Sequence, residues 1–142
     1  MEYGLLGEKL GHSYSKEIHE QLADYTYDLC PVSREDFDAF MTKHDFKAIN
    51  VTIPYKQDVI PYLDAMDDNA ASIGAVNTIV NDNGRLTGHI TDGEGFVHNL
   101  KDHGIDIKGK KITVAGGGGA ATAIQVQCAL DGARAVSYTH LR

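Results

Sequence analysis

The sequence is poor in cysteine and contains no long apolar run. Cys30 and Cys128 lie far apart, without Cys-x-x-Cys spacing, so buried free thiols are expected rather than a disulfide or a redox pair. No apolar run approaches the roughly 20 residues that span a bilayer, and no basic segment followed by an apolar stretch opens the sequence. A cytoplasmic protein without a membrane partner is therefore expected.

Concentrated positive charge and metal-binding clusters are also lacking. The formal net charge is -7, with no block of lysine and arginine. Nucleic acids and anionic membrane surfaces call for clustered positive charge, so neither is expected as a partner. His98 and His103 miss the i, i+4 spacing of a helical metal site, and no Cys/His cluster forms, so no metal is expected.

Strands and helices are predicted to alternate along the first hundred residues. This order favours an α/β fold with an open, mostly parallel sheet and helices on both faces. Asn81-Asp82-Asn83-Gly84 predicts a hairpin, which would supply one antiparallel strand. Strands are expected at residues 3–7, 25–32, 48–53, 75–80 and 86–90, and helices around residues 18–23, 37–41, 59–63, 69–73 and 93–103.

A second unit is predicted to begin after residue 103. A strand at 111–115, a glycine-rich turn, a helix that runs to Leu130 and a strand at 133–138 indicate the start of a Rossmann-like domain. We therefore expect a substrate-binding and catalytic domain over residues 1–103 and a partial, truncated nucleotide-binding domain over residues 104–142.

The glycine-rich turn is a candidate dinucleotide site. In such folds one glycine makes the tight turn, a second admits the pyrophosphate, and a third small residue allows close packing, roles that Gly116, Gly118 and Ala121 fit. The unpaired N–H groups of a helix N-terminus favour the anion. The alternative is a flexible linker. The expected cofactor-binding residues are Gly116, Gly117, Gly118, Gly119, Ala120 and Ala121.

The end of the second strand of such a domain usually selects the cofactor, with a carboxylate for a ribose hydroxyl or an arginine for a 2′-phosphate. Residues 137–142 include Arg142 and no acid, which leans towards NADP and leaves NAD open.

Lys56 and Asp92 are candidates for proton transfer. Lys56 follows a predicted buried strand and Pro54, and Asp92 stands in Thr91-Asp92-Gly93. Oxidation of a secondary alcohol by hydride loss needs a partner for the hydroxyl proton, and both side chains are competent. The alternative is a surface salt bridge.

Two hydroxyls, those of Ser13 and Ser15, lie in one predicted loop and suit the hydrogen-bonding needs of a carboxylate. The alternative for Ser15 is that it caps the helix that follows.

Five motifs in order resemble shikimate dehydrogenase. They are Gly-His-Ser-x-Ser at 11–15, Asn-Val-Thr-x-Pro-x-Lys at 50–56, Gly-Ala-Val-Asn-Thr at 74–78, Thr-Asp-Gly-x-Gly-Phe at 91–96, and the Gly-Ala-Ala turn at 119–121. The resemblance implies NADP-dependent reversible reduction of 3-dehydroshikimate to shikimate in aromatic amino-acid biosynthesis. It also covers quinate/shikimate dehydrogenases that use NAD or NADP.

The resemblance implies roles for particular residues. Lys56 and Asp92 would be catalytic, Ser13 and Ser15 would hold the substrate carboxylate, and the glycine-rich turn would meet the cofactor diphosphate. The residues expected around the ring hydroxyls are Asn50, Thr52, Asn77 and Asp92, with Lys56 also in contact with the substrate.

The sequence departs from the family pattern in several places. Lys16 stands where proline is usual, Glu20 and Ile90 stand where asparagine is common, and Gly117 replaces a common alanine. Family members also continue well beyond residue 142, so we interpret the chain as a fragment. It could bind shikimate without catalysing its oxidation. Its oligomeric state stays open, with a homodimer as one candidate.

Overall fold

The computed structural model describes residues 1–138 and divides into two compact units, Met1–His89 and Ile90–Arg142. This division falls before helix α4 (Asp92–Asp102), whereas the sequence placed that stretch in the first domain. The difference arises because α4 packs against helix α5 (Gly119–Leu130), which belongs to the second unit.

The first unit contains a six-stranded sheet with the order β2-β1-β3-β5-β6-β4. β5 runs antiparallel to both of its neighbours, and the other pairs are parallel. The prediction of a mostly parallel sheet with one antiparallel strand is thus confirmed. The strands are β1 (Tyr3–Gly7), β2 (Tyr27–Pro31), β3 (Ala48–Val51), β4 (Ala65–Met66), β5 (Thr78–Asp82) and β6 (Arg85–His89).

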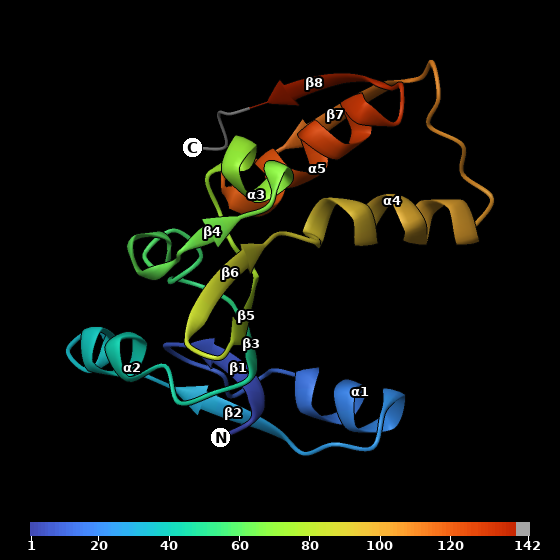
Figure 1. Cartoon of the computed structure of the whole chain (residues 1–142). Helices are drawn as coiled ribbons and strands as arrows, with labels where there is room; N and C mark the ends of the chain where they lie inside the picture. Colours follow the sequence, from blue (N-terminus) through green and yellow to red (C-terminus); the bar gives the residue numbers. More distant parts are fainter. Residues whose placement is uncertain (139–142) are drawn as a thin grey trace. The chain divides into compact units, whose positions relative to one another are not determined.

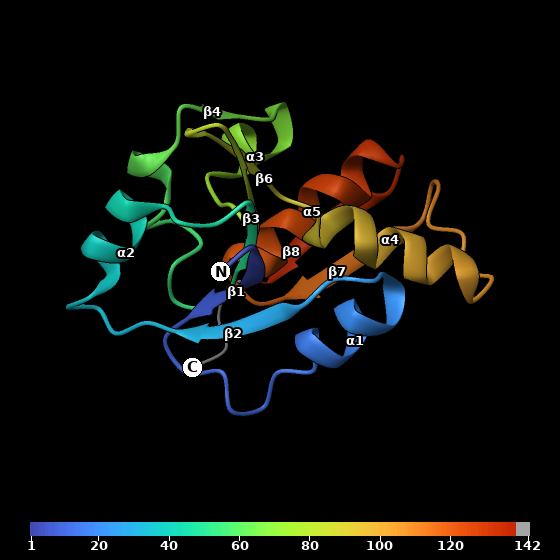
Figure 2. The ribbon, with the colours of Figure 1, turned by 60° about the horizontal axis from the view of Figure 1, so that its bottom comes forward.

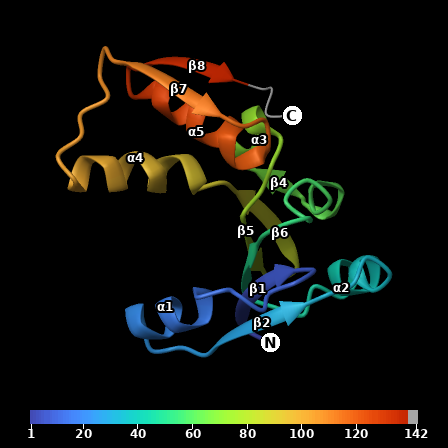
Figure 3. The same ribbon diagram turned by 180° about the vertical axis from the view of Figure 1, so that it is seen from behind.

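Helices α1 (Ser15–Leu22) and α2 (Phe37–Lys43) lie on opposite faces of this sheet (Figures 1 and 3). The strand order explains the arrangement. The chain leaves β1 for β2 through α1, then returns past β1 to β3 through α2. Because both crossovers are right-handed and run in opposite directions, their helices cover opposite faces. A 3-10 helix, η1 (Ile60–Tyr62), and helix α3 (Asp68–Ile73) follow β3.

The core of the first unit comes from apolar side chains of the central strands and of α2. Leu6, Ile49 and Ile79 are fully buried on adjacent strands. Phe37 of α2 stacks on the buried ring of Tyr55, with ring centroids 4.4 Å apart. This packing holds the segment that follows β3 against the sheet.

The predicted hairpin joins β5 to β6 through Asn83 and Gly84. Both residues have positive φ, 53° and 94°, which asparagine and glycine tolerate best. The Asn81 side-chain oxygen accepts a hydrogen bond of 2.7 Å from the Gly84 N–H, which closes the turn.

Several details differ from the sequence-based expectation. β5 spans Thr78–Asp82 rather than residues 75–80. β3 ends at Val51 rather than at residue 53, because residues 53–59 form a turn that includes a cis Ile53–Pro54 peptide. The two-residue strand β4 was not predicted, since so short a segment shows no periodicity. The helical spacing of Ile18, Leu22 and Ala23 predicts one shared helix face, but Ile18 and Leu22 are exposed and α1 ends before Ala23.

The second unit pairs β7 (Lys111–Ala115) with β8 (Arg134–Tyr138) in parallel, joined through α5. α4 and α5 lie side by side (Figure 2). Their core includes the buried residues Val97, Ile107 and Cys128. A strand–glycine turn–helix–strand unit is what the sequence predicted here, and it matches the first half of a Rossmann motif.

Both cysteines are free thiols, as predicted, but only Cys128 is buried as expected, whereas Cys30 is half-buried. Within residues 1–138, every helix is too short or too polar to cross a bilayer.

Candidate functional site

A cavity of about 560 Å³ lies beyond the carboxyl ends of β1 and β3. From β1 the chain continues to β2 on one side of the sheet, and from β3 it continues to β5 on the other side. Ligands of open α/β sheets bind at such a switch point. Three predicted substrate-binding residues meet there: Ser13, Ser15 and Thr52. The lining residues are Leu5, Lys9, Leu10, Gly11, His12, Ser13, Ser15 and Thr52.

The two serines form a local hydrogen-bonded turn at the start of α1. The Ser13 hydroxyl accepts from the Ser15 N–H at 3.2 Å and donates to the Ser15 hydroxyl at 3.1 Å. α1 begins at Ser15, and the residue in the capping position is Tyr14, which makes no side-chain cap. The interpretation of Ser15 as the helix cap is therefore wrong, and both hydroxyls belong to the cavity wall.

Thr52 reaches the cavity because β1 and β3 approach each other closely at their ends. Its N–H donates to the Leu6 carbonyl at 2.9 Å, which continues the pairing of the two strands by one residue. A Cβ on Gly7 would lie 2.7 Å from both the Thr52 methyl and a Leu10 methyl. Glycine at position 7 thus allows the cavity wall to close around Thr52.

Lys56 lies in the turn after β3, and contacts of Lys56 and of its neighbour Tyr55 hold this turn in place. Its carbonyl accepts from the Val76 N–H at 2.8 Å, which ties the turn to the segment that carries Asn77. The neighbouring Tyr55 hydroxyl donates to the Val32 carbonyl at 2.7 Å, and burial raises the pKa of Tyr55. Asp92 belongs to the second unit, so the catalytic pairing of Lys56 with Asp92 stays a prediction.

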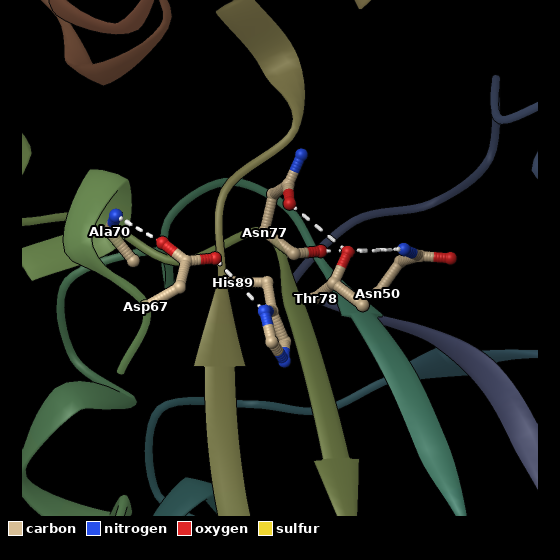
Figure 4. Close-up of polar contacts among 6 residues, drawn as sticks. All are labelled: Asn50, Asp67, Ala70, Asn77, Thr78 and His89. Atoms are coloured by element: carbon tan, nitrogen blue, oxygen red, sulfur yellow. Dashed lines mark hydrogen bonds and ion pairs between the residues drawn. The ribbon is translucent and has the colours of Figure 1, made fainter. Parts of the chain in front are cut away.

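Asn50, Thr78 and Asn77 form a hydrogen-bonded chain across β3 and β5 (Figure 4). Asn50 and Thr78 are directly opposite each other in the sheet. The Asn50 Nδ2 donates to Thr78 Oγ1 at 3.0 Å, and Thr78 Oγ1 donates to Asn77 Oδ1 at 3.0 Å. On the far side, Asn50 Oδ1 accepts from the Tyr27 hydroxyl at 2.7 Å.

Asp67 and His89 extend this polar row to the next strand (Figure 4). His89 pairs with Thr78 in the sheet, and its carbonyl accepts from the Asn77 N–H at 2.9 Å. Its Nδ1 lies 2.9 Å from one oxygen of Asp67, whose other oxygen caps α3 through the Ala70 N–H. The backbone of Asn77 is therefore held by β6, and the start of α3 is tied to the same residue of β6.

Sequence reasoning missed Tyr27, Asp67 and His89 as supports of this row. Tyr27 lies 23 residues from Asn50, and no local pattern connects them. For Asp67 a signal existed, because an aspartate before a short helical stretch is a common N-cap.

The glycine-rich turn could hold a cofactor diphosphate. Gly116 has φ of 138°, a conformation that favours glycine, and Gly118 is the N-cap of α5. The positions where Gly117 and Gly118 would carry a Cβ have no atom within 4 Å, so an anion can approach the backbone. The first turn of α5 contains no acidic residue. These features fit a phosphate group at a helix N-terminus.

Residues 139–142, on which part of the cofactor preference rested, lie outside the described residues. In the described part of the chain, no group of three or more histidine, cysteine, aspartate or glutamate side chains could hold a metal ion.

Two departures from the family pattern, Lys16 and Glu20, interact with each other and with the same residue of β2. They make an i, i+4 ion pair of 2.5 Å on α1. Lys16 Nζ also donates to the Tyr27 carbonyl at 2.8 Å, and Glu20 accepts from the Tyr27 N–H at 3.1 Å. β2 is an edge strand, so these side chains satisfy backbone groups that no neighbouring strand reaches.

Residues 5–79 match the family described as the shikimate dehydrogenase substrate binding domain, and this segment covers more than half of the 142 residues. The chain belongs to this family. The resemblance seen in the sequence motifs is thereby confirmed. All residues that line the cavity fall inside the matched segment.

Relatives and solved structures agree with this family assignment. A shikimate dehydrogenase (NADP(+)) of Alkaliphilus oremlandii is 42% identical over 142 residues, which cover 94% of this chain and 50% of the relative. The chain thus spans about half the length of the curated relatives it matches.

Two shikimate dehydrogenase structures share the fold over nearly the whole chain. One, from Listeria monocytogenes in complex with shikimate and NAD, has a TM-score of 0.87 and 39% identity, and the match covers 100% of this chain and 53% of that one. The other, from Thermus thermophilus in complex with NADP(H) and shikimate, has a TM-score of 0.90 and 30% identity, with coverage of 99% and 56%. The predicted α/β fold with a Rossmann-like second part is confirmed.

Proposed function

We propose that the protein catalyses the NADP-dependent, reversible reduction of 3-dehydroshikimate to shikimate. The observation that carries the proposal is the cavity at the β1/β3 switch point, lined by Ser13, Ser15 and Thr52 within the family's substrate-binding segment. No aspartate or glutamate is among the lining residues, while Lys9 is. This composition suits the carboxylate of shikimate.

In the proposed reaction the carboxylate of the substrate binds the hydroxyls of Ser13 and Ser15. The ring hydroxyls of the substrate face Asn50, Thr52 and Asn77. A nicotinamide cofactor bound at residues 116–121 supplies the hydride acceptor. Lys56 and Asp92 handle the proton of the oxidised hydroxyl, so that the alcohol loses a hydride from carbon and a proton from oxygen.

NADP is the proposed cofactor, since the relatives are named as NADP(+) enzymes. NAD stays an alternative, because the Listeria structure contains it. Cytoplasmic location and a homodimeric assembly belong to the same proposal.

The first experiment replaces Lys56 by alanine in the full-length protein. Loss of a general acid/base should reduce kcat by ~10²- to 10⁴-fold, while shikimate affinity changes little. Formation of NADPH, followed by absorbance, and calorimetric titration with shikimate measure the two quantities. Lys47→Ala is a matched control, because Lys47 is exposed and pairs with Glu2. Unchanged turnover in Lys56→Ala would exclude the assigned role.

A second candidate function is shikimate binding without catalysis. It is favoured by the location of the cavity, whose lining residues all belong to the first unit. Turnover of shikimate or quinate by the isolated 142-residue chain would exclude the binding-only function. Binding of shikimate without NADPH formation would support it.

A further inference from the structure

The side chains of the polar row that belong to strands, and that of Tyr27, lie on one face of the sheet. Leu5, Asn50, Thr78 and His89 are paired in register across four neighbouring strands, and their side chains therefore share one face of the sheet. Tyr27 lies on the same face, because its pairing partner Tyr3 precedes Leu5 by two residues. Its hydroxyl reaches past β1 to Asn50.

A backbone carbonyl fixes which end of the Asn50 amide faces β5. Asn50 Nδ2 lies 3.4 Å from the Asn77 carbonyl, which can only accept. The NH₂ group must therefore face β5, and the oxygen must face Tyr27. Because an amide oxygen only accepts, the Tyr27 hydroxyl is the donor in this contact.

The same direction passes to Asn77. Thr78 Oγ1 accepts a hydrogen bond from Asn50 Nδ2, and its own hydroxyl group donates one to Asn77 Oδ1. Asn77 Oδ1 is thus turned towards Thr78, and its Nδ2 points away from Thr78 (Figure 4). Burial raises the pKa of Tyr27, so the donor that starts the chain keeps its proton over the physiological range.

Tyr27 is itself held by the helix that carries Ser15. Its ring stacks on His19 of α1, with centroids 4.0 Å apart and planes within 11°. Lys16 and Glu20 of α1 bind its carbonyl and N–H. Tyr27 therefore connects α1, which begins at the cavity, with the row of hydrogen bonds that ends at Asn77.

We propose that Tyr27 is a positioning residue that helps to hold the Asn77 amide in place through Asn50 and Thr78. The inference rests on the proposed function, in which Asn77 binds a ring hydroxyl of shikimate. Without the Tyr27 hydroxyl, Asn50 Oδ1 loses its donor, and the Asn50 amide is held only by its Nδ2 contacts with Thr78 Oγ1 and with the Asn77 carbonyl. The Asn50 side chain is then held less firmly, and the Thr78 hydroxyl and the Asn77 amide shift with it.

The test is Tyr27→Phe in the 142-residue chain, read out by the side-chain amide NMR signals of Asn77 and by calorimetric titration with shikimate. We expect the Asn77 Nδ2 signals to shift and shikimate to bind about tenfold more weakly, in keeping with loss of one positioned hydrogen bond. Tyr25→Phe is the matched control: Tyr25 packs in the same cluster, but its hydroxyl bonds to His19. It should leave both readouts unchanged.

Asn77 signals that are the same in Tyr27→Phe and in the parent chain would overturn the inference, as would equal effects of the two tyrosine variants. If the parent chain fails to bind shikimate, the proposed function fails, and the Asn77 signals still decide the role of Tyr27.

Thr78→Val provides a second route that leaves the core at Tyr27 intact. It should shift the Asn77 signals by itself, and Tyr27→Phe added to it should produce no further shift. Additive shifts would show that Tyr27 does not act through Thr78 and would overturn the inference, as would unmoved Asn77 signals in Thr78→Val if Tyr27→Phe does not fold.

Discussion

Glycine at position 7 shows how one residue controls the shape of the cavity. It stands at the end of β1, where the chain turns towards the loop of Ser13. Its missing side chain lets Thr52 and Leu10 approach to a distance that no Cβ would permit. Two residues of the cavity lining, Thr52 and Leu10, thus approach each other because Gly7 has no side chain.

In Gly7→Ala the steric clash in the folded state should outweigh the stabilisation that alanine gives by restricting the unfolded backbone. We expect about 1–3 kcal/mol of destabilisation from overpacking, together with weaker shikimate binding. Gly11→Ala is the control for the change in stability, because no atom lies within 4 Å of its added Cβ. Urea unfolding and calorimetry measure the two effects, and equal behaviour of the variants would contradict the steric explanation.

At the scale of elements, α4 depends on one of its two glycines. A Cβ on Gly93 would lie 2.6 Å from the backbone oxygen of Ala123 in α5, whereas Gly95 has open space around it. The two positions share a helix and a residue type but differ in what they face. Close approach of α4 to α5 is therefore the reason for glycine at position 93.

Alanine at these two positions should have opposite effects. Gly93→Ala should destabilise the second unit by about 1–3 kcal/mol, because a backbone atom must move. Gly95→Ala should stabilise it by about 0.5–1 kcal/mol through helix propensity. Thermal unfolding followed by circular dichroism tests the pair, and destabilisation by both variants would contradict the explanation.

The contacts that Lys16 and Glu20 of α1 make with the edge strand β2 should stabilise the fold to an extent that depends on pH. The hydrogen bond from Lys16, followed by that from the Tyr27 N–H, holds the pKa of Glu20 below its usual value of 4.5. The ionised form therefore stabilises the fold above pH 4.5, and this contribution disappears as the pH falls through the lowered pKa.

Glu20→Gln should accordingly lower the urea midpoint at pH 7, and its difference from the parent chain should shrink as the pH falls below 4.5. Glu17→Gln, on the same helix, serves as the control for charge alone. A pH-independent difference would show that the carboxylate is not responsible.

At the scale of the whole molecule, the two units differ in how much structure supports them. The first has six strands and a buried core, whereas the second has a two-stranded sheet in which β7 has no buried residue. Two-stranded sheets are marginal by themselves, and elements with few buried contacts open readily.

Hydrogen exchange should therefore be slower in the first unit. We expect backbone amides of β1 and β3 to exchange at least tenfold more slowly than those of β7, as measured by NMR at neutral pH. Equal protection in all three strands would show that the second unit is as stable as the first.

Local patterns in the sequence were sufficient for the strand and helix order, the Asn83-Gly84 hairpin and the family motifs, because each depends on residues close together in the chain. They also marked Ser13, Ser15, Thr52 and Lys56, whose functional groups suit a polar acid. They did not reveal β4 or the supports of Asn77.

Only the tertiary structure brought Thr52 to the serines and Tyr27 to Asn50. The physical reason is strand order: placing β1 between β2 and β3 joins segments that are more than 20 residues apart. Residue type thus determined which chemistry this protein can offer, while sheet register and the close packing at Gly7 decided which of those groups meet.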